Sequence, residues 1–132
     1  MKIIADTNIL VRAITDDHPV QSPLAQAQLN QAEIVAITLP TLCELAWVLS
    51  RSYKISRIDL AAMLRRLCAA DNVKLEQASA DAGLAFLDAG GDFADGVIVH
   101  EGNWLGGQMF VSFDADAVRI AKAQGQATHI PA

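Results

Sequence analysis

The sequence lacks long hydrophobic runs and contains little glycine and proline. No apolar stretch reaches the roughly 20 residues that a membrane-spanning helix needs. Asp6, Asn8 and Arg12 interrupt the N-terminus before the apolar segment of a signal peptide could form. Only 8 glycines and 4 prolines among 132 residues, with 52% hydrophobic residues, exclude a fibrous or disordered chain. We therefore expect a cytoplasmic globular protein with a single domain over residues 1–132.

Cysteine is also scarce. Cys43 and Cys68 lack CxxC spacing, and both fall in apolar stretches with helical patterning. This spacing favours buried reduced thiols over a disulfide or a zinc site.

The net charge of −5 at first argues against a nucleic-acid partner. The charge is unevenly distributed, however, because residues 67–132 carry most of the acidic excess. A basic patch within residues 51–66 consists of Arg51, Lys54, Arg57, Arg65 and Arg66. Solvated helix faces explain this patch as well as a phosphate-contacting surface does.

Short β-rich runs alternate with helical patterns, which indicates an α/β fold with a mostly parallel sheet. We predict strands at residues 2–5, 33–37, 72–76, 108–113 and 127–130, and helices at residues 8–14, 20–31, 40–52, 57–69, 79–87, 93–104 and 115–124. Ser56 to Asp59 resembles a capping box, Pro40 suits a first helical turn, and Gly125 follows a helix as a C′ glycine should.

Two aspartates directly follow predicted strands. Asp6 ends the first strand and Asp114 ends the 108–113 strand. Open α/β sheets bind ligands at the carboxyl ends of their strands, so adjacent parallel strands would bring these carboxylates together. Each aspartate could instead simply cap the following helix.

Glu44 lies within an otherwise apolar helical segment, beside the stripe formed by Leu42, Leu45, Ala46 and Leu49. A carboxylate there must reach solvent, pair with a cation or bind a metal, because burying it unpaired is costly. We favour the metal-facing position.

Three further aspartates lie at predicted helix starts. Asp92 and Asp95 have the spacing of an N-cap and its N3 partner, so one could cap while the other faces a pocket. Asp116 is either a helix-dipole acid or an additional metal ligand.

In this order, the acidic segments resemble those of PIN-domain ribonucleases, most closely the VapC-type toxins of toxin–antitoxin pairs. The resemblance covers nearly the whole chain and rests on Asp6-Thr7-Asn8, the helical Glu44, Asp92-Phe93-Ala94-Asp95 and Ser112-Phe113-Asp114. Gly96 departs from the alanine more usual in the family, which could loosen the helix start by up to ~1 kcal/mol.

The resemblance implies a three-layer α/β/α domain that hydrolyses RNA with a water activated by Mg²⁺ or Mn²⁺. Asp6, Glu44, Asp95 and Asp114 take the metal-binding and catalytic roles, and Asp116 an auxiliary acidic role. Thr7, Asn8 and Ser112 would orient ligands or water by hydrogen bonds. The RNA backbone contacts that we infer from composition alone are Arg12, Arg51, Lys54 and Arg57.

The resemblance also implies two protein partners, a second copy forming a homodimer and a cognate antitoxin. The mean hydropathy of +0.27 is compatible with covered apolar surface, although a large core would also explain it. Trp47, Tyr53 and Trp104 are the aromatic interface candidates, but we expect ordinary core packing for each. We treat His18, His100 and His129 as structural or surface residues.

Two other functions fit this sequence pattern less well. A phosphotransferase of the haloacid-dehalogenase kind would need a second aspartate two residues after Asp6, where this chain has Asn8. A non-catalytic PIN fold that binds RNA or protein would have no reason to keep Glu44 in an apolar helix.

Overall fold

The computed structural model describes residues 1–132, which form two compact units, Met1–Glu76 and Gln77–Ala132. The helices are α1 (Thr7–Thr15), α2 (Gln21–Gln31), α3 (Leu39–Arg51), α4 (Arg57–Cys68), α5 (Gln77–Asp88), α6 (Phe93–Trp104) and α7 (Ala115–Ala123), and the strands are β1 (Lys2–Ile4), β2 (Ile34–Ala36), β3 (Val73–Lys74), β4 (Met109–Val111) and β5 (Ala127–His129). Each predicted strand and helix overlaps one of these elements. The single domain over 1–132 stays a prediction. None of the helices combines the length and apolar character that a membrane crossing requires.

The strands of the N-terminal unit form a parallel sheet in the order β1-β2-β3. Ile4 lies opposite Ala36, and Ala36 lies opposite Lys74, so the carboxyl ends of all three strands meet at one edge. Backbone hydrogen bonds continue this pairing past the strand ends, from the Ala5 amide to the Ala36 carbonyl at 3.0 Å. This edge is where α1 and α3 begin.

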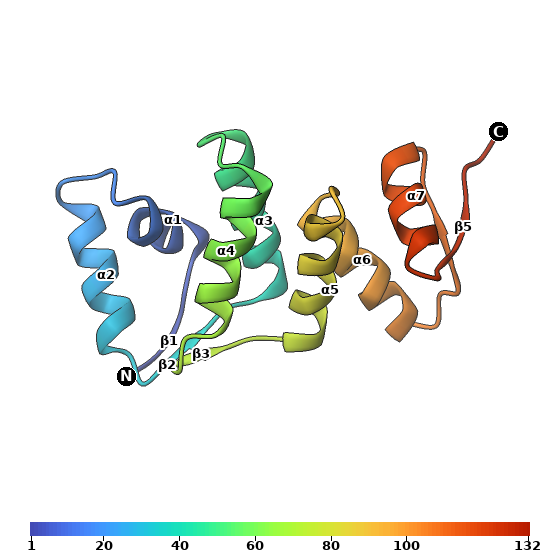
Figure 1. Cartoon of the computed structure of the whole chain (residues 1–132). Coiled ribbons are helices and arrows are strands. Elements are labelled where there is room, and N and C mark those ends of the chain that lie inside the picture. The colour runs from blue at the N-terminus through green and yellow to red at the C-terminus, as the bar shows by residue number, and fades with distance from the viewer. The chain divides into compact units, whose positions relative to one another are not determined.

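The helices of the N-terminal unit pack through apolar stripes. In this unit α1 packs against α2 and α3, and α3 packs against α4 (Figure 1). The predicted stripe of α3 is confirmed, because Leu42, Leu45 and Leu49 are fully buried and Ala46 is nearly so. The buried face of α3 therefore fixes which of its other side chains remain accessible.

The C-terminal unit pairs β4 with β5 in parallel and packs α5 closely against α6. A small core forms around Phe86, Ile120 and Ala121, with Val99 and Phe110 packed against it. Every strand pair of the chain is thus parallel, which confirms the predicted α/β class with a mostly parallel sheet.

The predicted helix signals are also confirmed. The Ser56 side chain accepts a hydrogen bond from the Asp59 amide and caps α4. Pro40 lies in the first turn of α3. Gly125 has a φ of 92° just past α7, a conformation that glycine adopts without strain.

The tryptophan and cysteine predictions are wrong in part. Trp47 and Trp104 are 59% and 80% exposed instead of packed in the core. Position 47 lies two residues from Leu45 and from Leu49, so it faces away from the buried stripe of α3. Trp104 is the last residue of α6. Cys43 and Cys68 are half-buried, not fully buried.

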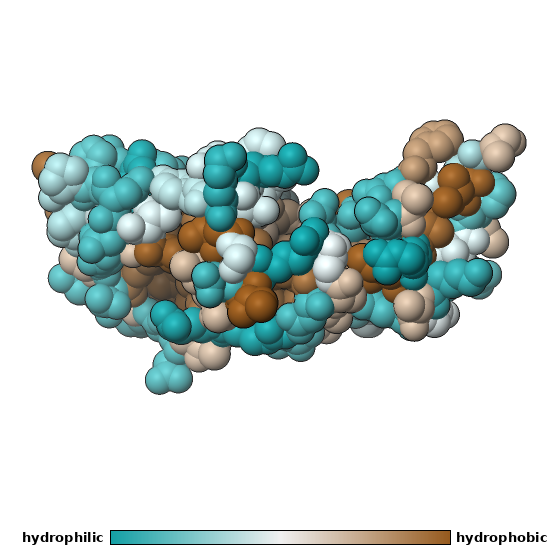
Figure 2. Space-filling view, turned by 45° about the horizontal axis from the view of Figure 1, so that its top comes forward, coloured by the Kyte–Doolittle hydropathy of each residue, from teal (hydrophilic) through white to brown (hydrophobic).

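Apolar side chains also remain open to the surface elsewhere. On the face drawn in Figure 2, hydrophobic residues in brown are exposed between hydrophilic residues in teal. Large examples are Ile58 and Phe113, both more than four-fifths exposed. A partner that covered such side chains would gain hydrophobic free energy.

Gly96 is explained by the close approach of α6 to α5. A Cβ added at Gly96 would lie 2.3 Å from the backbone oxygen of Ala82 and 2.9 Å from the Cα of Gly83. Glycine at this position therefore does more than loosen a helix start, because any larger residue would push the two helices apart.

Replacing Gly96 with alanine should destabilise the protein, even though alanine is favoured over glycine by ~1 kcal/mol in a helix interior. The matched control is Gly102→Ala in the same helix, where an added Cβ meets nothing within 4 Å. We expect the control to be neutral or stabilising. Urea unfolding of both variants checks this, and equal gains in the two would contradict the steric explanation.

Candidate functional site

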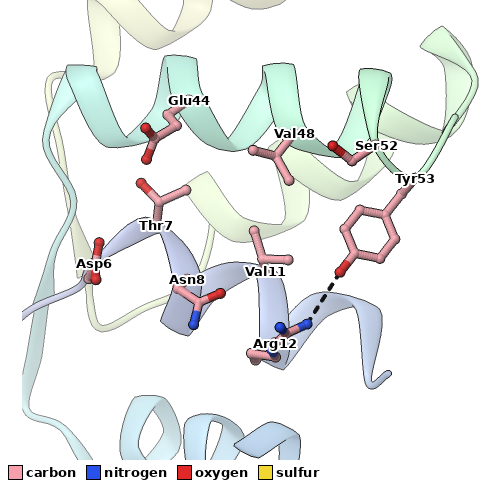
Figure 3. A pocket seen from close by; sticks show the side chains of 9 residues that line it. All are labelled: Asp6, Thr7, Asn8, Val11, Arg12, Glu44, Val48, Ser52 and Tyr53. Carbon is pink, nitrogen blue, oxygen red and sulfur yellow. Dashed lines mark hydrogen bonds between the residues drawn. The ribbon is translucent and has the colours of Figure 1, made fainter. Parts of the chain in front are cut away.

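A pocket of about 390 Å³ lies between α1 and α3 in the N-terminal unit. Its α3 wall consists of Glu44, Val48 and the C-cap residue Ser52, which are spaced four residues apart and so lie along one face of the helix. Figure 3 shows this wall opposite the side chains of α1. The pocket is lined by Asp6, Thr7, Asn8, Val11, Arg12, Glu44, Val48, Ser52 and Tyr53.

Asp6 lies at the carboxyl edge of the sheet, between β1 and α1. It occupies the N-cap position of α1 with extended backbone, but its side chain makes no capping hydrogen bond. The cap alternative is therefore wrong for this side chain. Its carboxylate is exposed and lines the pocket, so it is available to a ligand.

Glu44 avoids the cost of burial because its helix face opens into the pocket. The side chain is exposed, although Leu45 beside it is fully buried. In Figure 3 its carboxylate points toward the Thr7 hydroxyl across the space between α3 and α1. The structure thus brings together Asp6, Thr7, Asn8 and Glu44 from the predicted set.

The third charged group of the pocket is Arg12, which other side chains hold in place. Its Nε donates to Gln21 at 3.1 Å, and its Nη1 donates to Asp17 at 3.1 and 3.2 Å and to the Tyr53 hydroxyl at 3.4 Å. Tyr53 in turn donates to Asp17 at 2.7 Å. Arg12 is therefore part of a hydrogen-bonded network that ties the end of α1 to the end of α3.

In the C-terminal unit, Asp92 and Asp95 lie at the start of α6. Asp92 occupies the N-cap position without a side-chain capping bond, and its backbone oxygen accepts from the Asp95 amide at 3.1 Å. The pKa of Asp95 is raised, first by burial and then by the negative charges of Asp92 and Asp114. Asp92 and Asp114 are therefore close enough to disfavour the ionised form of Asp95.

Asp114 differs from Asp6 and Asp92 because its side chain caps the following helix. Its Oδ1 accepts from the amides of Asp116 and Ala117 at 3.0 and 3.1 Å. The Ser112 hydroxyl accepts from the Asp114 amide at 3.0 Å and so orders this turn. Both capping bonds use one carboxylate oxygen, and the other oxygen makes no hydrogen bond within the protein.

Asp116 lies in the first turn of α7 and is exposed, as a helix-dipole acid would be. Its side chain is 3.6 Å from Arg119, and both side chains are largely exposed. An exposed pair of this kind contributes little to stability.

The predicted basic residues lie around the end of α3 and the start of α4. Arg51 is in the last turn of α3, and Arg57 is the first residue of α4. Lys54 lies in the turn between them with a φ of 55°. All three are exposed, unlike Arg12.

His18 has the structural role expected for it. Its Nδ1 accepts hydrogen bonds from the amides of Val20 and Gln21 at the start of α2. His100 is half-buried and His129 is exposed.

The donor chemistry of the predicted acids fits a hard divalent cation. Carboxylate oxygens are the ligands that Mg²⁺ prefers, and Asp6 keeps its carboxylate out of helix capping. The raised pKa of Asp95 also indicates a site where added positive charge would be favourable. Neither unit by itself groups three His, Cys, Asp or Glu side chains that could hold a metal ion.

Sequence reasoning missed the residues that surround Arg12. Asp17 carried no predicted role, and Tyr53 was considered only as an interface or core aromatic. The spacing of Glu44, Val48 and Ser52 on one helix face could have revealed the pocket wall. The contact of Tyr53 with Asp17 could not have been found this way, because 36 residues separate them.

Asp95→Asn should leave the free energy of unfolding unchanged or higher at neutral pH. A carboxyl whose pKa is raised in the folded state destabilises the fold when ionised, and this cost disappears as the pH falls through the folded pKa toward 3.8. The advantage of the variant should therefore shrink on acidification. Urea unfolding over a pH series measures it.

The matched control for Asp95 is Asp59, which occupies the same third position of its own helix, α4. Asp59→Asn should cost about 0.3–1 kcal/mol, because it loses only a favourable interaction with the helix dipole. A larger loss in Asp95→Asn than in this control at neutral pH would contradict the electrostatic argument.

Asp114→Asn and Asp114→Ala should differ in stability. Asparagine retains an acceptor oxygen for the two amides of α7, whereas alanine leaves them uncapped and should cost about 1 kcal/mol. Thermal unfolding of both variants at neutral pH distinguishes them. Equal losses would mean that the charge of Asp114, and not its cap, stabilises the helix.

Comparison with known proteins assigns the family. The PIN domain model matches residues 3–123, which is most of the chain and includes all the predicted acids. No curated protein and no solved structure matches the sequence significantly. The seven helices and parallel strands fit the three-layer α/β architecture of that family. The chain therefore belongs to the PIN domain family, whose members are typically nucleases that often depend on metal ions.

Proposed function

We propose that this PIN domain is a metal-dependent endoribonuclease that acts as a VapC-type toxin in the cytoplasm. The observation that carries the proposal is that Asp6 lies at the start of α1 without using its side chain as a cap, and lines one pocket with the exposed Glu44. Carboxylates kept out of local structure in this way are available for ligand binding. The match over residues 3–123 supports nuclease chemistry for them.

The proposed metal ligands are Asp6, Glu44, Asp95 and Asp114, with Asp116 as an auxiliary acid. When bound, Mg²⁺ or Mn²⁺ would lower the pKa of a water molecule and neutralise charge on the scissile phosphate. Glu44 contributes a carboxylate to the same pocket as Asp6. Asp114 can bind through the carboxylate oxygen that does not cap α7.

The neighbouring polar groups would hold substrate and water. Thr7 and Asn8 line the pocket, and Ser112 orders the turn that carries Asp114. Asp92 would act through its charge on Asp95. Exposed Arg51, Lys54 and Arg57 would contact the RNA backbone.

We also propose a homodimer and a cognate antitoxin as protein partners. The exposed side chains of Trp47 and Trp104 support this, because aromatic residues are enriched at protein interfaces. The alternative function, a non-catalytic PIN fold that binds RNA or protein, would keep such partners but would not need the acids.

The test is cleavage of structured RNA by protein freed of antitoxin, with Mg²⁺ or Mn²⁺ and with chelator. Chelation, Asp6→Asn, Asp95→Asn and Asp114→Asn should each abolish cleavage, because each removes the cation or a ligand. Asp59→Asn is the control, since it removes a carboxylate at the same helix position as Asp95. Mapping the product ends identifies the cut bond.

Metal binding measured by calorimetry separates the remaining outcomes. Cleavage that survives chelation or any of the three substitutions would refute the assigned site. Protein that neither cuts RNA nor binds the metal would favour the non-catalytic alternative.

A further inference from the structure

The bonding of Arg12 leaves part of its guanidinium group unused. Nε and Nη1 donate to Gln21, Asp17 and Tyr53, whereas Nη2 donates to no protein acceptor. The side chain is 27% exposed and lines the pocket that contains Asp6 and Glu44. Arg12 therefore presents a fixed cation with free N–H groups in the pocket that also contains the two carboxylates.

Asp17 is the carboxylate that holds Arg12 and Tyr53 in place. It accepts hydrogen bonds from Tyr53 and Thr15, both at 2.7 Å, as well as from Arg12. Together these partners lower its pKa from 3.8 to about 2, with the Tyr53 hydrogen bond as the largest cause. Asp17 is thus ionised throughout the physiological range.

Asp17 also determines which acid Arg12 pairs with. A mobile arginine in this pocket would be attracted to Asp6 or Glu44 and would neutralise them. The only ion pair of Arg12 is with Asp17, at 3.1 Å. Figure 3 shows the link from Arg12 to Tyr53 at the end of the pocket away from Asp6 and Glu44. Arg12 consequently forms no ion pair with either of the two pocket carboxylates.

We propose that Asp17 and Tyr53 are positioning residues that hold Arg12 at the pocket, where its Nη2 group binds a phosphate of the RNA strand. This inference rests on the proposed ribonuclease function. An arginine held by several other side chains loses little further conformational entropy when it binds an anion. The clamp formed by Asp17 and Tyr53 therefore has two effects. It orients Arg12 for phosphate binding, and it keeps Arg12 from pairing with Asp6 or Glu44.

The test is binding of a short fluorescein-labelled single-stranded RNA of mixed sequence, measured by anisotropy over a range of salt concentrations. All variants are made in the Asp95→Asn protein with Mg²⁺ present, so that the RNA stays intact. Arg12→Ala should weaken binding about tenfold, the value of a charge-assisted hydrogen bond. It should also reduce the salt slope by about 0.7, the contribution of one phosphate contact on a single strand.

Tyr53→Phe removes one hydroxyl and no charge. It should weaken binding about threefold, because the hydrogen bonds of the hydroxyl to Arg12 and Asp17 are lost while Asp17 still pairs with Arg12, and the salt slope should stay unchanged. Asp17→Ala distinguishes most clearly between an electrostatic effect and a positioning effect. Removing a negative charge would tighten RNA binding if only electrostatics mattered, whereas loss of positioning weakens it.

Lys122→Ala is the control for loss of one positive charge, because Lys122 is exposed in the last turn of α7. It should change binding much less than Arg12→Ala. Circular dichroism establishes that each variant is folded, and Tyr53→Phe preserves the test if Asp17→Ala does not fold.

Several results would overturn the inference. These are tighter binding by Asp17→Ala, unchanged binding by Tyr53→Phe or Arg12→Ala, and no RNA binding by the parent protein. Cleavage by the protein without the Asp95→Asn change tests the nuclease proposal separately. Clamp-dependent binding without cleavage would refute the nuclease and leave the role of Arg12 standing.

Discussion

Parallel pairing of β1 with β2 is the constraint on which the N-terminal pocket depends. The pairing aligns the carboxyl ends of the two strands, so the helices that follow them, α1 and α3, start at the same edge. Asp6 then lies at that edge, and Glu44 faces α1 from the second turn of α3. Backbone hydrogen bonds, and not contacts between the acids themselves, bring these two like charges to one pocket.

The carboxylates divide into those that stabilise the fold locally and those that do not. Asp114 caps α7 with one oxygen, and Asp17 anchors Arg12 and Tyr53. Asp6 makes no side-chain cap, and Asp95 has a raised pKa because it is partly buried near other acids. A fold that tolerates unpaired and desolvated carboxylates gives up stability, which is typical of a functional site.

Close packing in the C-terminal unit has a related consequence for Asp95. Gly96 allows α6 to approach the backbone of α5, and Asp95, the residue before it, is partly buried. Burial is the largest cause of the raised pKa of Asp95. The glycine that departs from the usual family residue is thus adjacent in sequence to the aspartate whose pKa burial raises.

The sequence by itself determined the α/β class, the order of the elements, the cap at Ser56 and the family, because these depend on local periodicity, hydrogen bonding within a few residues and motif order. Only the tertiary structure decided that the Asp6 side chain is not a cap, that Trp47 is exposed, and that Tyr53 meets Asp17 beside Arg12. Such outcomes depend on helix rotation and on contacts between residues far apart in the chain, which no local pattern encodes.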